Sequence, residues 1–300
     1  MQLPPPVALD LGAVARRHGL PGPVEPLPEQ GIFNSVYRVG DGLILRVPRN
    51  DPFFVAAARK ELVVVPAARE IGVRTPAIVV ADTSCELVPV PYAIYERAPG
   101  ETLDRLVADP ATADAVWREL GRDLALLHKK ASRASELAGL ACEALPEAET
   151  LLQDAAAGGH ISAVEQRWLS AWLETLAKAH PGEEVLVHGD IQSSNVMATA
   201  DGVVYSALID WGGCGWAERA SDFAGIPLRA VPALLDGYGS ADDDLKARIV
   251  RRQLQLALFN LRRGPQPGRS WAERPATMLV DILRFFAAAP PGWAAVAPRR

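Results

Sequence analysis

The order of hydrophobic and polar positions divides the chain into two parts with different periodicity. Up to about residue 100, apolar runs of strand length alternate with turn-forming residues. The runs NSVYRV and LILRV flank Gly40-Asp41-Gly42, and Asp-Gly between two such runs is a strong hairpin signal because the tight turn needs positive φ. Residues 34–48 are therefore predicted to form an antiparallel hairpin.

One helix is predicted in this first part, over residues 53–71, where Ala, Leu and Glu are frequent. We expect Pro66 to interrupt or kink it, because proline lacks the amide N–H, and Gly72 supplies a stop signal. Two further runs, AIVVAD and VPYAIYER, predict more strands. Strands, one helix and more strands indicate a small α+β unit.

From about residue 101 the pattern is typical of long helices. Helices are predicted at residues 111–131, roughly 146–157, 162–179, 242–263 and 271–288. The exception is residues 185–211, where two short apolar runs are joined by Asp201-Gly202 and preceded by a polar loop. The second part is therefore predicted to be helical with one inserted hairpin.

Composition supports a soluble globular protein with two units. Of 300 residues, 49% are hydrophobic and 22% are charged, and this length exceeds the usual range for one compact core. The net charge of −5 argues against a nucleic-acid partner, which requires a basic surface. Three cysteines, far apart in the chain, form neither a disulfide framework nor a zinc motif. No secretory signal or membrane-spanning run is recognised, so we expect a cytoplasmic protein.

Candidate chemistry is concentrated in two short segments. Residues 188–195, HGDIQSSN, form an H-x-D-x4-N loop, and Asp210 follows in LIDWG at the end of the predicted hairpin. Oxygen atoms of Asn195 and Asp210 are suitable ligands for magnesium, which prefers carboxylate, amide and phosphate oxygens. Asp190 then remains free to accept a hydroxyl proton. The alternative is that these three residues only stabilise turns, where Asp and Asn are common.

Together the two segments resemble the protein-kinase-like superfamily and, within it, the aminoglycoside phosphotransferase family, whose signature pairs H-G-D-x4-N with I-D-W or I-D-F. The resemblance implies an α+β, two-lobed protein-kinase-like fold. Residues 1–98 would form an N-terminal nucleotide-binding lobe, built on a small antiparallel sheet with one helix. Residues 99–300 would form a larger, mainly helical lobe that binds the acceptor. Asp190 would be the catalytic base, while Asn195 and Asp210 would hold Mg²⁺.

The same resemblance assigns nucleotide-binding residues in the first part. Residues 30–37, QGIFNSVY, are similar to the family's nucleotide-covering loop, so Gly31 and Asn34 are candidates there. Arg46 occupies the position where many relatives have lysine. It keeps the positive charge and can contact two phosphate oxygens at once, so we assign it to the α- and β-phosphates.

The remaining assignments concern the support of that site. Glu61, on the predicted helix, is the natural partner of Arg46, although a solvent-exposed role is nearly as compatible with the sequence. Glu96 and Ala98 fall where the segment between the lobes presents backbone groups to the nucleobase. Asp222 resembles the later family aspartate that braces the catalytic loop.

The resemblance implies transfer of the γ-phosphoryl of ATP or GTP to a small-molecule hydroxyl, with an aminoglycoside or another hydroxylated antibiotic as the leading acceptor. Choline- or homoserine-type metabolites remain alternatives. Residues 101–180 contain 13 acidic and 8 basic residues, which is compatible with a cationic acceptor but equally with solvated helix faces. A protein substrate is disfavoured, because the eleven residues between Asp210 and Asp222 leave no room for an activation segment.

One other class stays open, a nucleotide-binding scaffold without turnover, which is suggested by Arg46 in place of lysine and by Phe33 in the covering loop. A metal-dependent hydrolase that uses His188 and the aspartates is rejected, because no second histidine cluster accompanies them. The oligomeric state is not predicted.

Overall fold

The structure is a computed structural model, and it describes residues 4–27, 33–106, 110–133, 135–199, 204–239, 242–262 and 275–299. Two predicted features, Gly31 of the covering loop and the Asp201-Gly202 turn, lie outside these residues.

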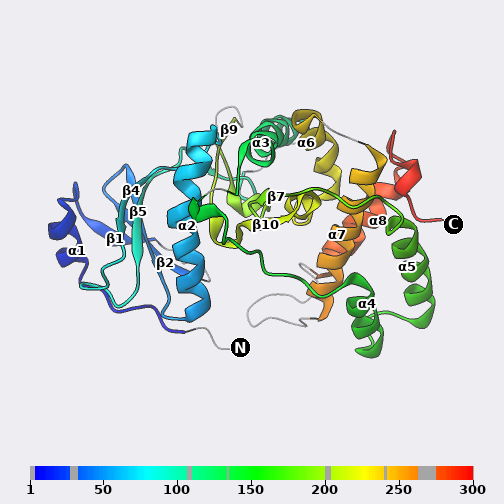
Figure 1. The fold of residues 1–300 in the computed structure, drawn as a ribbon, viewed down its shortest axis with the longest axis horizontal. Coiled ribbons are helices and arrows are strands. Elements are labelled where there is room, and N and C mark those ends of the chain that lie inside the picture. Colours follow the sequence, from blue (N-terminus) through cyan, green and yellow to red (C-terminus); the bar gives the residue numbers. More distant parts are fainter. Residues whose placement is uncertain are drawn as a thin grey trace.

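An antiparallel sheet forms the first part of the chain (Figure 1, blue and cyan). Its described strands are β1 (Val24–Pro26), β2 (Asn34–Val39), β3 (Leu43–Pro48), β4 (Ile78–Asp82) and β5 (Tyr92–Glu96), in the order β1-β2-β3-β5-β4. The predicted hairpin over residues 34–48 is confirmed, because β2 and β3 pair in register from Asn34 opposite Pro48 to Val39 opposite Leu43.

Two helices accompany this sheet. The short helix α1 (Leu11–His18) begins where the Asp10 carboxylate accepts a hydrogen bond from the Ala13 amide, and its sequence did not predict it. The long helix α2 (Pro52–Ile71) begins at the Asp51 N-cap and ends at Gly72, whose φ of 104° is readily adopted only by glycine.

The expected interruption of α2 at Pro66 is wrong, because the helix runs through this residue. Pro66 itself is exposed, whereas Val64, Val65 and Ala68 on the opposite side are buried in the core. Burial of that apolar face holds the helix together across the missing backbone hydrogen bond.

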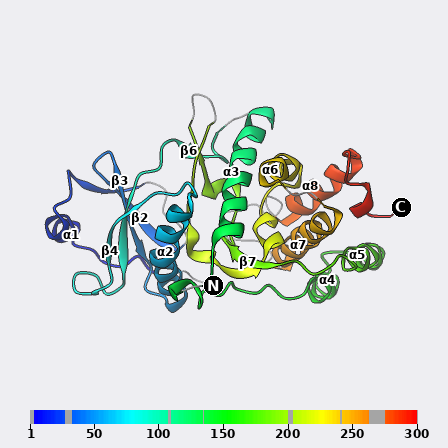
Figure 2. The same ribbon diagram turned by 45° about the horizontal axis from the view of Figure 1, so that its top comes forward.

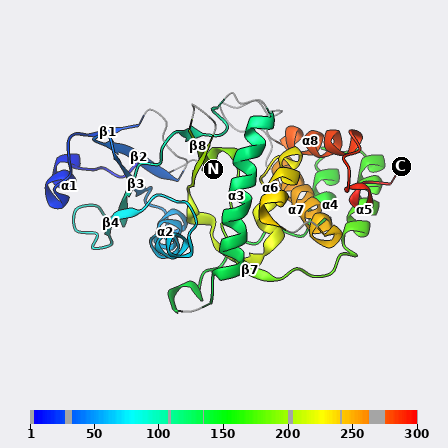
Figure 3. The same cartoon turned by 90° about the horizontal axis from the view of Figure 1, so that it is seen from above.

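The second part is mainly helical, as predicted. Its described helices are α3 (Pro110–Lys130), α4 (Ala148–Ala157), α5 (Ala163–Leu176), α6 (Val231–Tyr238), α7 (Asp243–Arg262) and α8 (Pro275–Ala287). The five predicted helices are present, with ends displaced by up to three residues where the structure describes them, and residues 271–274 of the last one lie outside the described residues. Helix α6 was not predicted from its eight residues. Figures 2 and 3 show α3 alongside α6, with α4, α5, α7 and α8 beyond them.

Short strands lie where this helical part meets the sheet. The predicted hairpin is present as β8 (Val196–Ala198) and β9 (Tyr205–Leu208), and β6 (Glu101–Thr102) adds to it in the order β6-β8-β9. A second, unpredicted pair joins β7 (Glu184–Val187) to β10 (Gly215–Glu218) in antiparallel register. This pair brackets the two segments that carry the candidate chemistry.

Two hydrophobic clusters make up the core. The smaller one lies against the sheet and includes Val39, Leu45 and Ile94, while the larger one fills the helical part. Helix α2 contributes Val64 and Val65 to the larger cluster, so it connects the sheet to the helical part. The fold is α+β and two-lobed, as predicted, and the boundary at residues 98 and 99 stays a prediction. No helix among the described residues combines the length and apolarity needed to cross a bilayer.

Candidate active site

The β8–β9 hairpin brings the two chemistry-bearing segments together. Val196 pairs with Leu208, and the ladder extends by one hydrogen bond from the Ile209 amide to the Asn195 carbonyl, 3.0 Å long. Asn195 therefore lies opposite Ile209, and Asp210 is the next residue along that side of the hairpin. This proximity of residues 15 positions apart in sequence follows from the hairpin register alone.

The loop of residues 188–195 passes close to the turn that follows Asp210. Gly189 has a φ of 82°, and a Cβ atom at this position would overlap the Gly213 carbonyl, so only glycine fits. A Cβ atom placed on Gly213 would lie 3.4 Å from the Asp190 Cβ atom. Asp190 therefore lies against the turn that follows Asp210.

Asp190 itself has an exposed side chain. The Gln192 amide donates to both of its carboxylate oxygens at 3.2 Å, and Asn195 Nδ2 donates to its Oδ2 at 3.2 Å and to its backbone carbonyl at 2.8 Å. These donors orient the carboxylate, and its exposure lets it reach an external hydroxyl. Such a group can act as a general base.

Buried groups hold the loop from behind. The Asp222 carboxylate is fully buried and accepts the His188 and Gly189 amides at 3.0 and 2.7 Å, together with a 2.9 Å contact from His128 Nε2. The bracing position expected for Asp222 from the sequence is the one it occupies. The backbone around Asp190 is thus fixed by an anion inside the core.

His188 is a structural part of the same loop. Its Nε2 atom lies 3.0 Å from the Ile209 carbonyl, and its Nδ1 atom lies 3.3 Å from the Asp190 amide. Its ring packs edge-on against Trp211 with a centroid separation of 4.6 Å. Burial lowers the pKa of His188, and the neutral form with the proton on Nε2 satisfies both contacts.

Arg46 connects the sheet to the helical part. Its Nη1 donates to Glu61 Oε2 and its Nη2 donates to Asp210 Oδ1, each at 2.7 Å. The Tyr95 hydroxyl donates to the same Glu61 oxygen at 2.7 Å. Glu61 is only 4% exposed, so the solvent-exposed role that the sequence left open is wrong. The planar guanidinium can bridge two carboxylates, which a lysine ammonium does less rigidly.

The charges in this group shift one another's pKa. Burial raises the pKa of Glu61 to about 7, against the opposing effect of Arg46. Burial also opposes the charged forms of the other two groups, but the carboxylates outweigh it and raise the pKa of Arg46, while Arg46 outweighs it and lowers the pKa of Asp210. Arg46 and Asp210 are therefore both charged at neutral pH.

Asp210 also has an unusual backbone. Its φ of 68° and ψ of 64° are left-handed, a conformation that Asp tolerates better than most residues. A strained residue persists where the surrounding structure holds it, and such residues are frequent at functional sites. The buried Trp211, whose Nε1 donates to Thr75 Oγ1 at 3.0 Å, anchors the next position.

The other sequence candidates lie at the sheet. Asn34 begins β2 and lines a small cavity of about 10 Å³ with Arg46, Glu61 and Tyr95. Glu96 ends β5, where its amide donates to the Ala77 carbonyl at 2.9 Å, and Ala98 follows two residues later. No contact in the structure tests the nucleobase role of these last two residues.

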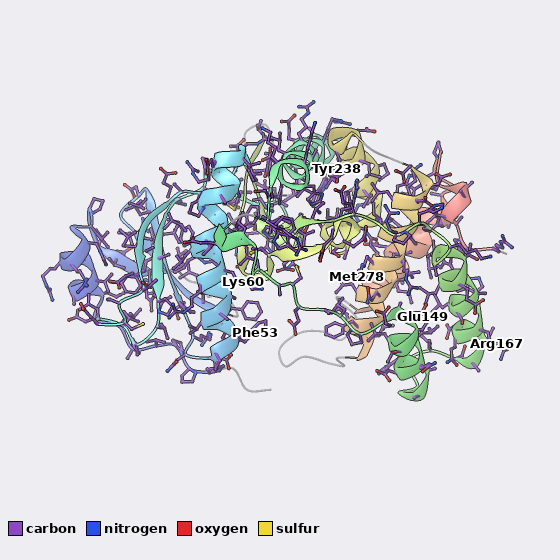
Figure 4. All side chains as sticks on the ribbon, viewed as in Figure 1. Phe53, Lys60, Glu149, Arg167, Tyr238 and Met278 are labelled. Atoms are coloured by element: carbon purple, nitrogen blue, oxygen red, sulfur yellow. The ribbon has the colours of Figure 1, made fainter. Side chains whose placement is uncertain are left out.

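Sequence reasoning missed two residues that hold the site. Tyr95 supports Glu61, and its only sequence signal is an inward position on an apolar strand. Lys60 donates to the Cys214 carbonyl at 3.2 Å and to the Ala141 carbonyl, so it fastens α2 to the turn after Asp210. Figure 4 shows Lys60 on the side of α2 that faces the helical part.

The donor set near Asn195 and Asp210 suits magnesium. Across the described ranges, no group of three or more His, Cys, Asp and Glu side chains lies close enough together to hold a metal ion by itself. One carboxylate and one amide oxygen supply only part of a coordination shell, and Mg²⁺ typically completes such a shell with phosphate oxygens and water. The residues therefore fit a metal that arrives with a phosphorylated ligand.

Comparison with known proteins identifies the family. The family model described as the phosphotransferase enzyme family, APH, matches residues 24–254. The chain belongs to this family. The match spans both the sheet and the site described above, and it confirms the resemblance recognised in the sequence. The protein is a phosphotransferase.

Solved structures share the fold over most of the chain. The GDP complex of wild-type aminoglycoside 2'-phosphotransferase-IIIa has a TM-score of 0.66 at 18% identity, with 91% of this chain and 97% of that chain covered. Macrolide 2'-phosphotransferase MphH from Brachybacterium faecium has a TM-score of 0.59 at 21% identity, with 97% and 99% covered.

A choline/ethanolamine kinase family protein from Mesorhizobium loti has a TM-score of 0.60 at 18% identity, with 95% of each chain covered. The comparison with curated proteins finds no match. At these identities the structural likeness establishes the kinase-like fold, and the acceptor has to be argued from the site.

Proposed function

We propose that this protein transfers the γ-phosphoryl group of ATP or GTP to a hydroxyl group of a small molecule, of the hydroxylated-antibiotic class. The observation that carries the proposal is the convergence of Asp190, Asn195 and Asp210 around one hairpin, with Arg46 joined to Asp210 at 2.7 Å. Similar solved structures are complexes with GDP or ADP, which supports a purine nucleotide as donor.

Phosphoryl transfer asks the protein for position and charge rather than for covalent chemistry. Asp190 is exposed and oriented by Gln192 and Asn195, so it receives the proton of the acceptor hydroxyl and aligns the oxygen for attack. Arg46 supplies a fixed cation for phosphate oxygens, and Glu61 with Tyr95 holds its direction.

We further propose that Asn195 and Asp210 bind Mg²⁺ together with the nucleotide. The metal neutralises phosphate charge when it is bound. Gly31 and Asn34 would cover the phosphates with backbone groups, and Glu96 and Ala98 would face the nucleobase. These assignments rest on the family motif at matching positions of this chain.

The acceptor proposal has support from relatives with the same fold. Among them are kanamycin and gentamicin complexes of aminoglycoside phosphotransferases and two macrolide 2'-phosphotransferases. A metabolite of the choline type is the second candidate, supported by the choline/ethanolamine kinase family protein.

Mass spectrometry across a panel of antibiotics, amino alcohols and amines tests the proposal, with ATP and GTP run in parallel. We expect one panel member to gain the mass of a phosphoryl group, and nucleotide consumption to depend on that member. Nucleotide consumption without an acceptor would instead indicate a hydrolase, and binding without consumption would indicate a scaffold.

A further inference from the structure

Three phenylalanine rings form an aromatic cluster at one end of α2. The ring centroids are 4.8 Å apart for Phe33 and Phe54, 5.8 Å for Phe53 and Phe54, and 6.2 Å for Phe33 and Phe53. Phe54 is buried, but Phe53 is 52% exposed and Phe33 is 38% exposed. Two large apolar side chains are thus rigidly packed against a buried one while much of their surface remains in contact with water.

Helical periodicity places this cluster near the turn that follows Asp210. Ala57 and Glu61 face the turn after Asp210, because a Cβ atom on Gly212 would lie 3.1 Å from Ala57 Cβ and 3.5 Å from Glu61 Oε1. Phe53 precedes Ala57 by four residues and so lies on the same face of α2, about 6 Å further along the axis. Figure 4 shows Phe53 on the side of α2 toward the helical part.

Phe33 reaches the same place from the sheet. It directly precedes Asn34 of β2, and its carbonyl accepts the Arg49 amide at 2.9 Å, at the end of the β2–β3 hairpin. Arg46 lies three residues earlier on β3. The two exposed rings therefore lie near the groups that we assign to phosphate binding, where contact with a wholly polar substrate would leave their apolar surface in water.

Carboxylates at the start of α4 are paired with an arginine of this chain. The Arg251 guanidinium on α7 forms a two-pronged contact with Glu149, at 2.8 and 3.0 Å, and an ion pair with Glu147 at 3.7 Å. Part of the acidic excess of residues 101–180 is therefore neutralised by an arginine of this chain. A polycationic ligand would have to compete with a tethered guanidinium for these carboxylates.

We infer that Phe33 and Phe53 form an apolar wall of the acceptor site, and that the acceptor is an alcohol with an extended apolar face and few cationic groups. This inference rests on the proposed function and narrows its acceptor class. Contact with an aromatic ring removes apolar surface from water on both partners, and the packed cluster offers that surface already in place.

Steady-state kinetics with two probes tests this inference. Erythromycin is a large, mainly apolar macrolactone with a single amine on an attached sugar, whereas kanamycin is a polyamine. For the wild type we expect phosphorylation of erythromycin with a kcat/KM at least tenfold above that for kanamycin. For Phe53→Ala we expect the KM for erythromycin to rise about tenfold, the scale of a lost aromatic contact, with kcat and the nucleotide KM little changed.

Val79→Ala is the matched control, because Val79 is 53% exposed and lies on β4 of the same sheet. Its kinetics should equal those of the wild type, and thermal unfolding of both variants shows that they are folded. Phe53→Tyr keeps the ring and should keep the KM for erythromycin.

Three results would overturn the inference. If only kanamycin is phosphorylated, the acceptor class is wrong while the proposed function stands. A rise in nucleotide KM without a rise in acceptor KM for Phe53→Ala would place the wall at the nucleotide instead. If neither probe nor any member of the wider panel is phosphorylated, the proposed function itself fails and the inference falls with it.

Discussion

The two halves of the site are held by different kinds of interaction. Around Asp190, the loop is fixed by the buried Asp222, which accepts two backbone amides, and by the buried His188. Around Arg46, position depends on side-chain contacts with Glu61 and Asp210 at 2.7 Å. One half is part of the folded core of the helical region, and the other is an ion-pair chain between sheet and hairpin.

In the first half the structure fixes the conformation of the backbone, and in the second half it fixes the position of charged side chains. A backbone held by a buried carboxylate keeps its conformation when an exposed side chain on it is changed, so Asp190 can be altered without moving the loop. The Arg46 group has no such support, and removal of one member leaves a buried charge without its partner. Variants around Asp190 should therefore change mainly kcat, and variants that disturb the position of Arg46 should change mainly the nucleotide KM.

The largest effect is expected for Asp190→Ala. Loss of the base should lower turnover by roughly 10²-fold or more, the usual scale for a positioned base. Nucleotide affinity should change little, because the loop is braced from behind. Parallel measurement of kcat and of nucleotide binding checks this, and an unchanged kcat would remove Asp190 from the mechanism.

Asp210→Ala should next abolish the magnesium dependence of nucleotide binding. The variant removes a proposed metal ligand and one of the two carboxylates that contact Arg46. Calorimetric titration of ATP with and without Mg²⁺ measures the effect, and Asp41→Ala is the control because that carboxylate is fully exposed on the β2–β3 turn. A preserved response to Mg²⁺ would contradict the ligand assignment.

Tyr95→Phe should produce a smaller and selective effect. It removes the hydroxyl that donates to Glu61 at 2.7 Å, so Arg46 is held less firmly and the nucleotide KM should rise a few-fold with kcat nearly retained. The lost hydrogen bond should also lower the free energy of unfolding by about 1 kcal/mol.

Tyr92→Phe on the same strand is the matched variant for this test. Its hydroxyl donates to Asp82 at 2.9 Å and lies 2.7 Å from His18 Nε2, rather than supporting Glu61, so its loss should lower stability without affecting the nucleotide KM. Equal KM values for the two variants would show that Tyr95 has no positioning role.

The smallest effect concerns pH and the catalytic loop. Because burial lowers the pKa of His188, the unfolded chain binds more protons than the folded one below the ordinary imidazole pKa of 6.5. The stability contributed by neutral His188 is therefore fully present above pH 6.5 and is lost progressively as the pH falls from 6.5 toward the lowered pKa of the folded state.

Urea unfolding across this range measures the slope, which should be shallower in His188→Gln than in the wild type. An identical slope for His188→Gln would show that this buried imidazole does not control the pH dependence.

Much of the architecture was predictable because it depends on local patterns. The 34–48 hairpin follows from alternating strands around a glycine turn, and the long helices follow from their apolar periodicity. The motif at residues 188–195 with Asp210 identified the family, because its spacing is a property of the sequence. Short elements such as α6 and the β7–β10 pair were missed, since a few residues carry too little pattern.

The amino-acid sequence by itself determined the two-part organisation, the chemistry of the candidate site and the family. Only the tertiary structure decided that Arg46 meets both Glu61 and Asp210, that Asp222 and His128 meet beneath the catalytic loop, and that α2 continues through Pro66. The physical reason is the distance along the chain over which each kind of interaction acts. Periodicity and turn chemistry act between near neighbours, whereas an ion pair or a buried contact depends on how distant segments pack.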